Sequence, residues 1–220
     1  MYSIAIDGPA GAGKSTIAKM VAKNLDFIYV DTGAMYRAMA LYFIRNQIGD
    51  KEEEKIAAAC KEIQVSLSYE NEEQQVILNG ENVNAYIRTE EVSMMTSNIS
   101  KYPVVREKLL SLQRELAQTS NVIMDGRDIG TCVLPDATAK IYLTASSAER
   151  ARRRYKEQTQ RGLECDLQEI ERDIIARDEQ DMNREIAPLR QAEDAVLVDS
   201  SDMTIEEVVD EIIRIYKEKA

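Results

Sequence analysis

A glycine-rich segment near the start of the chain carries residues that could hold a phosphate group. Residues 8–15 match the pattern G-x-x-x-x-G-K-[ST] in full; they follow a short apolar stretch, 3–6, and precede residues 16–25, whose apolar positions have helical spacing. In a strand, glycine loop and helix of this kind, backbone N–H groups converge on phosphate oxygens at the positive end of the helix. We therefore predict that Lys14 reaches the β- and γ-phosphates of a nucleotide and that the Ser15 hydroxyl binds Mg²⁺ directly. The predicted loop residues are Gly8, Pro9, Ala10, Gly11, Ala12, Gly13, Lys14, Ser15 and Thr16.

A second group of charged residues follows another predicted buried strand. Residues 122–124 are apolar and lead directly into Asp125, Gly126, Arg127 and Asp128. An aspartate at the end of such a strand commonly accompanies a phosphate loop on the Mg²⁺ side, and we expect Asp125 to bind the ion through water. Aspartate after a strand is also common without a metal role, so this interpretation depends on the phosphate loop.

Arginines are concentrated in one part of an acidic chain. Guanidinium groups match phosphate oxygens and the charge of a transferring phosphoryl group. The alternative is a solvated helical face with i,i+4 ion pairs, such as Glu149–Arg153, and for Arg152 and Arg154 both interpretations stay open. The position of Gly162 between two predicted helices favours a mobile lid over a nucleotide. Nine of the sixteen arginines lie here: Arg150, Arg152, Arg153, Arg154, Arg161, Arg172, Arg177, Arg184 and Arg190.

Composition excludes several other kinds of chemistry. The 220 residues carry a net charge of −11 and include no histidine. The lack of histidine rules out Ser-His-Asp and Cys-His nucleophiles and imidazole acid–base catalysis, whereas phosphoryl transfer needs no imidazole. The negative charge argues against binding to nucleic acid or to an anionic membrane. With no long apolar run and no leader before the first predicted strand, we expect a cytoplasmic protein with reduced thiols at Cys60, Cys132 and Cys165.

The elements that must position these residues alternate between strands and helices. This alternation predicts an α/β fold with a five-stranded parallel sheet covered by helices on both faces, and ligands at the carboxyl ends of the strands. Four strands are followed by aspartate, namely Asp7, Asp31, Asp125 and Asp199, which either serve the chemistry or cap the next helix. Predicted strands are 3–6, 27–30, 122–124, 140–143 and 195–198; predicted helices include 16–25, 34–46, 52–62, 104–118, 167–181 and those starting at the capping boxes Ser146–Glu149 and Thr204–Glu207. In the last helix we expect Ile205, Val208, Val209, Ile212 and Ile215 on the inner side.

One stretch departs from this alternation. Residues 63–88 have period-two patterning, a polar turn at residues 70–73 and the hairpin signal Asn79-Gly80. We predict a small antiparallel β insert there and a helical lid region over residues 147–181. The whole chain, residues 1–220, is expected to form a single phosphate-loop kinase domain.

The chain resembles the bacterial cytidylate kinases, within the nucleoside monophosphate kinase family, along essentially its whole length. The combination is far more specific than the phosphate loop, which many families share. One departure is Thr32, where the family often has serine; the hydroxyl is kept. The resemblance is carried by residues 6–16, 31–37, 87–89, 125–131, 178–181 and 183–189.

The resemblance implies an ATP-dependent (d)CMP kinase. The expected reaction moves the γ-phosphoryl group of ATP to CMP or dCMP by direct in-line, Mg²⁺-assisted transfer, giving CDP or dCDP, and the expected enzyme is a monomer. The implied catalytic residues are Lys14, Asp125, Arg127 and Arg177. ATP is expected on the phosphate loop with Arg150, Arg153 and Arg154. CMP is expected on Thr32, Arg37, Ser97, Arg106, Arg127, Asp128, Arg177, Asp181 and Arg184, of which Ser97, Arg106 and Asp128 face the cytosine.

Other functions remain open on the residues alone. A kinase for another nucleotide or for a small metabolite would use the same phosphate loop. A nucleotide-dependent switch is a different class, but the N-K-x-D element of guanine-specific switches is missing from the sequence. A structural phosphate-binding module would have little use for the arginine-rich segment.

Overall fold

The computed structural model describes residues 1–71, 73–160 and 162–220. Two predicted residues, Glu72 of the polar turn and Arg161 of the arginine-rich segment, therefore lie outside the described residues. The chain divides into two compact units: the first combines Met1–Tyr29 with Ser120–Ala220, and the second is Val30–Thr119.

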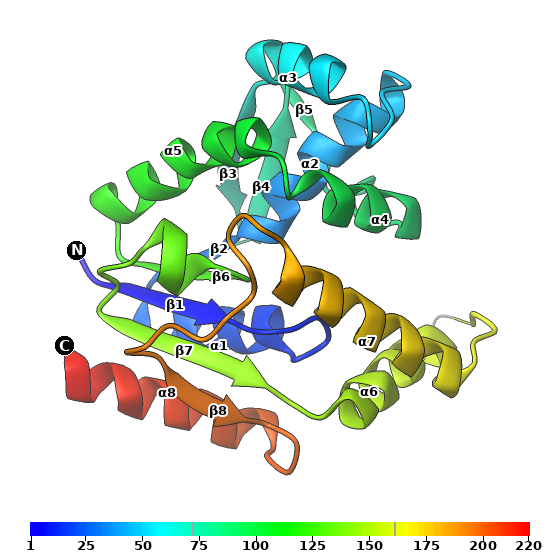
Figure 1. The fold of residues 1–220 in the computed structure, drawn as a ribbon. Coiled ribbons are helices and arrows are strands. Elements are labelled where there is room, and N and C mark those ends of the chain that lie inside the picture. Colours follow the sequence, from blue (N-terminus) through cyan, green and yellow to red (C-terminus); the bar gives the residue numbers. More distant parts are fainter. Residues whose placement is uncertain (72, 161) are drawn as a thin grey trace. The chain divides into compact units, whose positions relative to one another are not determined.

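The five-stranded sheet is parallel, as predicted. Its strands are β1 (Ser3–Asp7), β2 (Ile28–Asp31), β6 (Val122–Gly126), β7 (Ala139–Thr144) and β8 (Val196–Asp199), in the order β2-β6-β1-β7-β8. β1 pairs in parallel with β6 on one side and with β7 on the other, and Figure 1 shows it inside the sheet. In this register Ala5 lies between Met124 and Lys140. The loops that follow β1, β6 and β7 therefore leave the same edge of the sheet, where the predicted site residues begin.

Helices of the first unit build its main hydrophobic core. α1 and α8 pack against the sheet face that carries Ile4 and Ile6, both fully buried (Figure 1). The capping box at Thr204 is present, but Ile205, predicted to face inward, is 48% exposed because it belongs to the first turn of α8. None of the helices within the described ranges is long and apolar enough to cross a membrane. The helical elements are α1 (Lys14–Leu25), the π-helical turn η1 (Ile129–Val133), α6 (Ser147–Gln160), α7 (Leu167–Asn183) and α8 (Ile205–Lys219).

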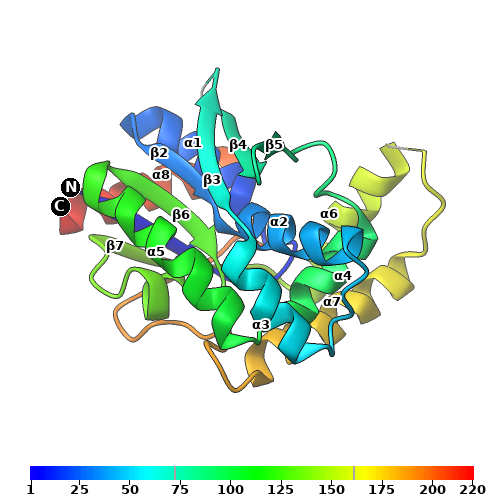
Figure 2. The same ribbon diagram turned by 90° about the horizontal axis from the view of Figure 1, so that it is seen from above.

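The second unit combines helices with a small antiparallel sheet. Figure 2 shows α2 beside α4, and the three-stranded sheet of this unit also packs against α2. β4 pairs with β3 and β5, and Asn79 and Gly80 join β4 to β5 with φ of 49° and 87°, which confirms the hairpin signal. The elements are α2 (Thr32–Arg45), α3 (Glu53–Glu62), β3 (Val65–Glu70), β4 (Glu73–Leu78), β5 (Glu81–Asn82), α4 (Glu90–Ile99) and α5 (Pro103–Thr119).

Candidate functional site

The phosphate loop joins β1 to α1 in a conformation that requires glycine. Gly8 has φ of 151°, and a Cβ there would lie 1.9 Å from the carbonyl oxygen of Leu143. Gly13, with φ of 86°, precedes the first residue of α1 and has no side chain to cap the helix. The first N–H groups of α1 are therefore left for a ligand, and the positive end of the helix favours an anion such as phosphate.

Lys14 is held inside this loop. Its ammonium donates a hydrogen bond to the carbonyl oxygen of Pro9 at 2.7 Å, and the residue is 7% exposed. Burial lowers the pKa of Lys14 to about 7, and the positive charge of Arg127 acts in the same direction. The opposing carboxylates are Asp125, Asp7 and Asp181. A bound polyphosphate would add negative charge here and favour the protonated, charged lysine.

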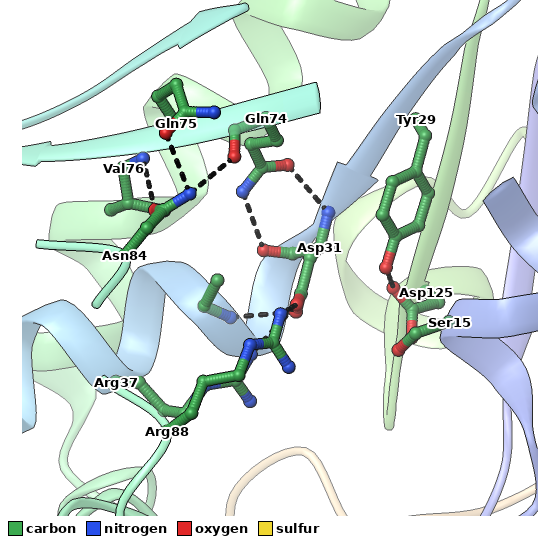
Figure 3. Close-up of polar contacts among 11 residues, drawn as sticks. Ser15, Tyr29, Asp31, Arg37, Gln74, Gln75, Val76, Asn84, Arg88 and Asp125 are labelled. Carbon is green, nitrogen blue, oxygen red and sulfur yellow. Dashed lines mark hydrogen bonds and ion pairs between the residues drawn. The ribbon is translucent and has the colours of Figure 1, made fainter. Parts of the chain in front are cut away.

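Ser15 and Asp125, the two residues predicted to lie on the metal side, contact each other. The Ser15 hydroxyl donates to Asp125 Oδ2 at 2.9 Å, and the Tyr29 hydroxyl donates to Asp125 Oδ1 at 2.9 Å (Figure 3). A hydroxyl and one carboxylate are hard oxygen donors of the kind that Mg²⁺ takes beside substrate phosphates. The described residues contain no group of three or more acidic, cysteine or histidine side chains that could hold a metal by itself. The donor set thus fits an ion that is completed by a nucleotide.

Asp7 links β1 to the segment that carries Arg127 and Asp128. Its carboxylate accepts hydrogen bonds from the backbone N–H groups of Ile129 and Gly130, both at 2.7 Å. Burial raises the pKa of Asp7 to about 6 although these two hydrogen bonds favour the charged form. The carboxylate therefore fixes the π-helical turn η1, which the sequence pattern did not indicate. π-helical turns often occur at functional sites.

Four predicted acceptor residues form one charged cluster in the first unit. Arg127 Nε donates to Asp181 Oδ2 at 2.9 Å, and Arg184 lies 3.9 Å from Asp181 Oδ1. Arg184 also lies 3.6 Å from Asp128 and donates to the carbonyl oxygen of Ala187 at 2.6 Å. Burial alone would raise the pKa of Asp181, but Arg127, Arg184 and Arg177 hold it below its usual value. Arg177 lies on α7, the helix that also carries Asp181.

Two of the three arginines predicted for ATP already have protein partners, and all three lie on α6. The buried Arg150 donates to the carbonyl oxygens of Ala145 and Ala10, each at 2.9 Å, and forms an ion pair with Asp178 at 2.7 Å. Arg153 bonds Glu149 at 3.1 Å, as the i,i+4 interpretation predicted, and donates to the Ser200 carbonyl oxygen at 2.7 Å. The contact of Arg150 with Ala10 ties the phosphate loop to α6. Whether these side chains also bind ATP stays a prediction.

The remaining predicted acceptor residues lie in the second unit. Thr32 is buried at the start of α2, and Arg37 in the same helix bonds the Asp31 carboxylate at 2.8 Å (Figure 3). Ser97 lies on α4 with a buried hydroxyl that has no hydrogen-bond partner within the described residues. Arg106 lies on α5 with its guanidinium 5.9 Å from the centre of the Tyr36 ring.

Sequence patterns did not single out the supporting residues of the site. Tyr29 was predicted only as part of an apolar strand. Asp178 belongs to the motif at residues 178–181, but no role was predicted for it. Gln74, whose side chain meets Asp31, lay in a polar hairpin. No local spacing marks such residues, because each reaches a partner that is distant in the sequence.

Comparisons with known proteins agree with the geometry of the site. The family model described as "Cytidylate kinase" matches residues 4–218. The chain is 50% identical over 214 residues to a cytidylate kinase of Caldicellulosiruptor saccharolyticus, covering 97% of this chain and 95% of that protein. It is 51% identical over 216 residues to a cytidylate kinase of Desulfitobacterium hafniense, covering 98% and 93%. Among solved structures, an uncharacterized protein from Eubacterium ventriosum matches with a TM-score of 0.51 at 10% identity over 99% of both chains, which supports the fold alone.

The matches extend over both units and include the phosphate loop, the Asp125 turn and the arginine-rich segment. They agree with the family that the sequence motifs predicted. A shared fold alone would not identify the family. An identity of about half of the residues along nearly the full length does identify it. The chain belongs to the cytidylate kinase family.

Proposed function

We propose that this member of the cytidylate kinase family transfers the γ-phosphoryl group of ATP to CMP and dCMP, giving CDP and dCDP. The observation that carries the proposal is the Ser15–Asp125 pair, 2.9 Å apart beside an intact phosphate loop, in a chain of this family. A switch protein or a structural phosphate module would not need the arginine and aspartate cluster around Asp181 as well.

The proposed reaction is a direct in-line transfer. An oxygen of the acceptor phosphate attacks the γ-phosphorus, the new P–O bond forms, and the bond to the β–γ bridging oxygen breaks to release ADP. Lys14, Arg127 and Arg177 neutralise the charge on the transferring group and hold the two nucleotides in line. Ser15, and Asp125 through water, would hold Mg²⁺, which would supply further positive charge to the β- and γ-phosphate oxygens.

The proposed ATP site consists of the phosphate loop and part of α6. Residues 8–16 would surround the phosphates, and the region 147–181 would act as a lid that excludes water. Arg150, Arg153 and Arg154 are the arginines proposed for the donor. For Arg150 this would require its guanidinium to exchange a present partner for a phosphate oxygen, since it now bonds Ala10, Ala145 and Asp178.

The proposed CMP site reads the base through a carboxylate. Cytosine presents an exocyclic amino group, from which Asp128 can accept a hydrogen bond, whereas uracil would place a carbonyl oxygen against the same carboxylate. Such a buried mismatch leaves two acceptors facing each other and disfavours UMP. The buried Ser97 hydroxyl, which lacks a partner among the described residues, is suited to the same ligand. The full proposed set is Thr32, Arg37, Ser97, Arg106, Arg127, Asp128, Arg177, Asp181 and Arg184.

Several broader predictions remain proposals as well. They are a single functional domain over residues 1–220, an insert at 63–88 on the acceptor side, a monomeric enzyme, and a cytoplasmic location. We propose that the protein binds neither nucleic acid nor membranes.

The test is an ADP-release assay with Mg²⁺ and ATP across CMP, dCMP, UMP, AMP, dTMP and shikimate. We expect high kcat/KM for CMP and dCMP and much lower values for the other acceptors. A preference for another acceptor would mean that the protein is a kinase with a substrate other than the one proposed. Slow ATP hydrolysis with no acceptor dependence would instead favour a switch.

A further inference from the structure

A single buried carboxylate in the second unit holds two guanidinium groups. Asp31 Oδ2 lies 2.8 Å from Arg37 NH2 and 3.1 Å from Arg88 NH2. The Asp31 side chain is 8% exposed, that of Arg37 19% and that of Arg88 61%. Figure 3 shows the two arginine side chains side by side as they approach the carboxylate. Arg88 belongs to the motif at residues 87–89.

The charges of Asp31, Arg37 and Arg88 do not balance. Burial alone would raise the pKa of Asp31, but Arg37, Arg88 and the N–H group of Ala34 hold it below its usual value, so the carboxylate is ionised. One negative and two positive charges leave a net charge of +1. The buried Nε of Arg37 also lacks a hydrogen-bond partner within the described residues. Two converging guanidinium groups with an unused donor suit a second anion, and a phosphate monoester offers oxygens to both.

The β insert supports this arrangement from the other side of Asp31. The Gln74 side chain of β4 accepts a hydrogen bond from the Asp31 N–H at 2.8 Å and donates one to the Asp31 carbonyl oxygen at 3.2 Å (Figure 3). Asn84 fixes Gln74 in turn, because its amide donates to the Gln74 carbonyl oxygen at 2.8 Å and its Oδ1 accepts from the Val76 N–H at 2.9 Å. The insert therefore holds the backbone of Asp31, the residue that carries the shared carboxylate.

We propose that Arg88 is a second guanidinium ligand of the acceptor phosphate, next to Arg37, and that Gln74 is a positioning residue that holds Asp31 for both arginines. This inference rests on the proposed function, in which Arg37 binds the phosphate of CMP. The insert then has a defined role, because it orients the phosphate-binding pair through Asp31. The phosphate group of the acceptor, rather than its base, is the part that Arg88 recognises.

The experiment compares CMP with cytidine, which lacks the phosphate. The Kd for CMP is measured by calorimetry and the Ki for cytidine by inhibition of the kinase reaction, for the unaltered enzyme, Arg88→Ala, Gln74→Ala and the double variant. Ser68→Ala is the control within the insert, because Ser68 is exposed on the neighbouring strand β3, where it lies opposite Gln75 rather than Gln74. Because Arg88 is largely exposed, Arg88→Ala should fold normally, and its melting temperature is recorded as a check.

We expect Arg88→Ala to raise the Kd for CMP about tenfold, the size expected for one charge-assisted hydrogen bond, and to leave the Ki for cytidine and the KM for ATP unchanged. Gln74→Ala should weaken CMP binding less, and its effect should shrink in the Arg88→Ala background, because both act through Asp31. An Arg88→Ala enzyme that binds CMP within twofold of normal, or that loses CMP and cytidine equally, would overturn the inference. Equal effects of Gln74→Ala and Ser68→Ala would overturn the role of Gln74. Failure of the unaltered enzyme to bind CMP would overturn the proposed function itself.

Discussion

Asp178→Asn should remove the negative charge that balances a buried cation between α6 and α7. The Arg150 and Asp178 side chains are 7% and 10% exposed and lie 2.7 Å apart. The other two bonds of Arg150, to the carbonyl oxygens of Ala145 and Ala10, are neutral and cannot replace the lost charge. Breaking such a buried pair by removing one partner costs about 3–5 kcal/mol. At roughly 2–4 °C per kcal/mol for a chain of this size, the melting temperature should fall by roughly 6–20 °C.

The assay is thermal and urea unfolding of the unaltered and variant enzymes. Arg152→Ala is the control, because Arg152 pairs with Glu149 on the same helix but is 66% exposed, and exposed pairs contribute about 0–1 kcal/mol. The double variant Arg150→Met with Asp178→Leu should recover part of the stability, since no unpaired charge then stays buried. A loss below about 1 kcal/mol for Asp178→Asn would refute the reasoning, because the pair would then behave like a surface ion pair.

Further predictions concern the site. Lys14→Ala should lose most of the kcat while the far-ultraviolet circular dichroism stays unchanged, and turnover near normal would contradict the role of this lysine. Because the pKa of Lys14 is lowered to about 7, the lysine is largely neutral at pH 8, and ATP binding at this pH should take up protons as the phosphates favour the charged lysine. At pH 6 the lysine is already charged, so the proton uptake should be much smaller. Calorimetry in buffers of different ionisation enthalpy measures the proton uptake, with Lys14→Ala as the control. Asp128→Asn should lower the ratio of kcat/KM for CMP over UMP at least about tenfold, and an unchanged ratio would mean that the base is read elsewhere. Gly8→Ala should fail to fold or bind ATP, because its Cβ would lie 1.9 Å from the Leu143 carbonyl oxygen, whereas Gly80→Ala has no atom within 4 Å to meet and should cost only backbone strain.

The aspartates at strand ends show what a sequence pattern can predict and what it cannot. The pattern placed Asp7, Asp31 and Asp125 at one edge of a parallel sheet but left open whether each caps a helix or serves the site. Asp31 does cap α2, since it accepts from the Ala34 N–H, and it also binds two arginines. Asp7 fixes η1, and Asp125 meets Ser15. These roles differ because each depends on which distant segment the fold brings next to the carboxylate.

The family was predicted from the resemblance of several motifs to those of the bacterial cytidylate kinases. Contiguous patterns in the chain were sufficient to predict the phosphate loop, the α/β fold and the antiparallel insert. All of these depend on neighbouring residues whose spacing reports local geometry: a glycine where the backbone needs it, period two in a strand, helical spacing in a helix. Three-dimensional packing was needed to show that Gln74 meets Asp31 across 43 residues, that Arg127 meets Asp181 across 54 and that Arg150 is buried against Asp178. Such pairs follow from strand order and helix packing, which bring together side chains whose separation along the chain carries no periodic signal.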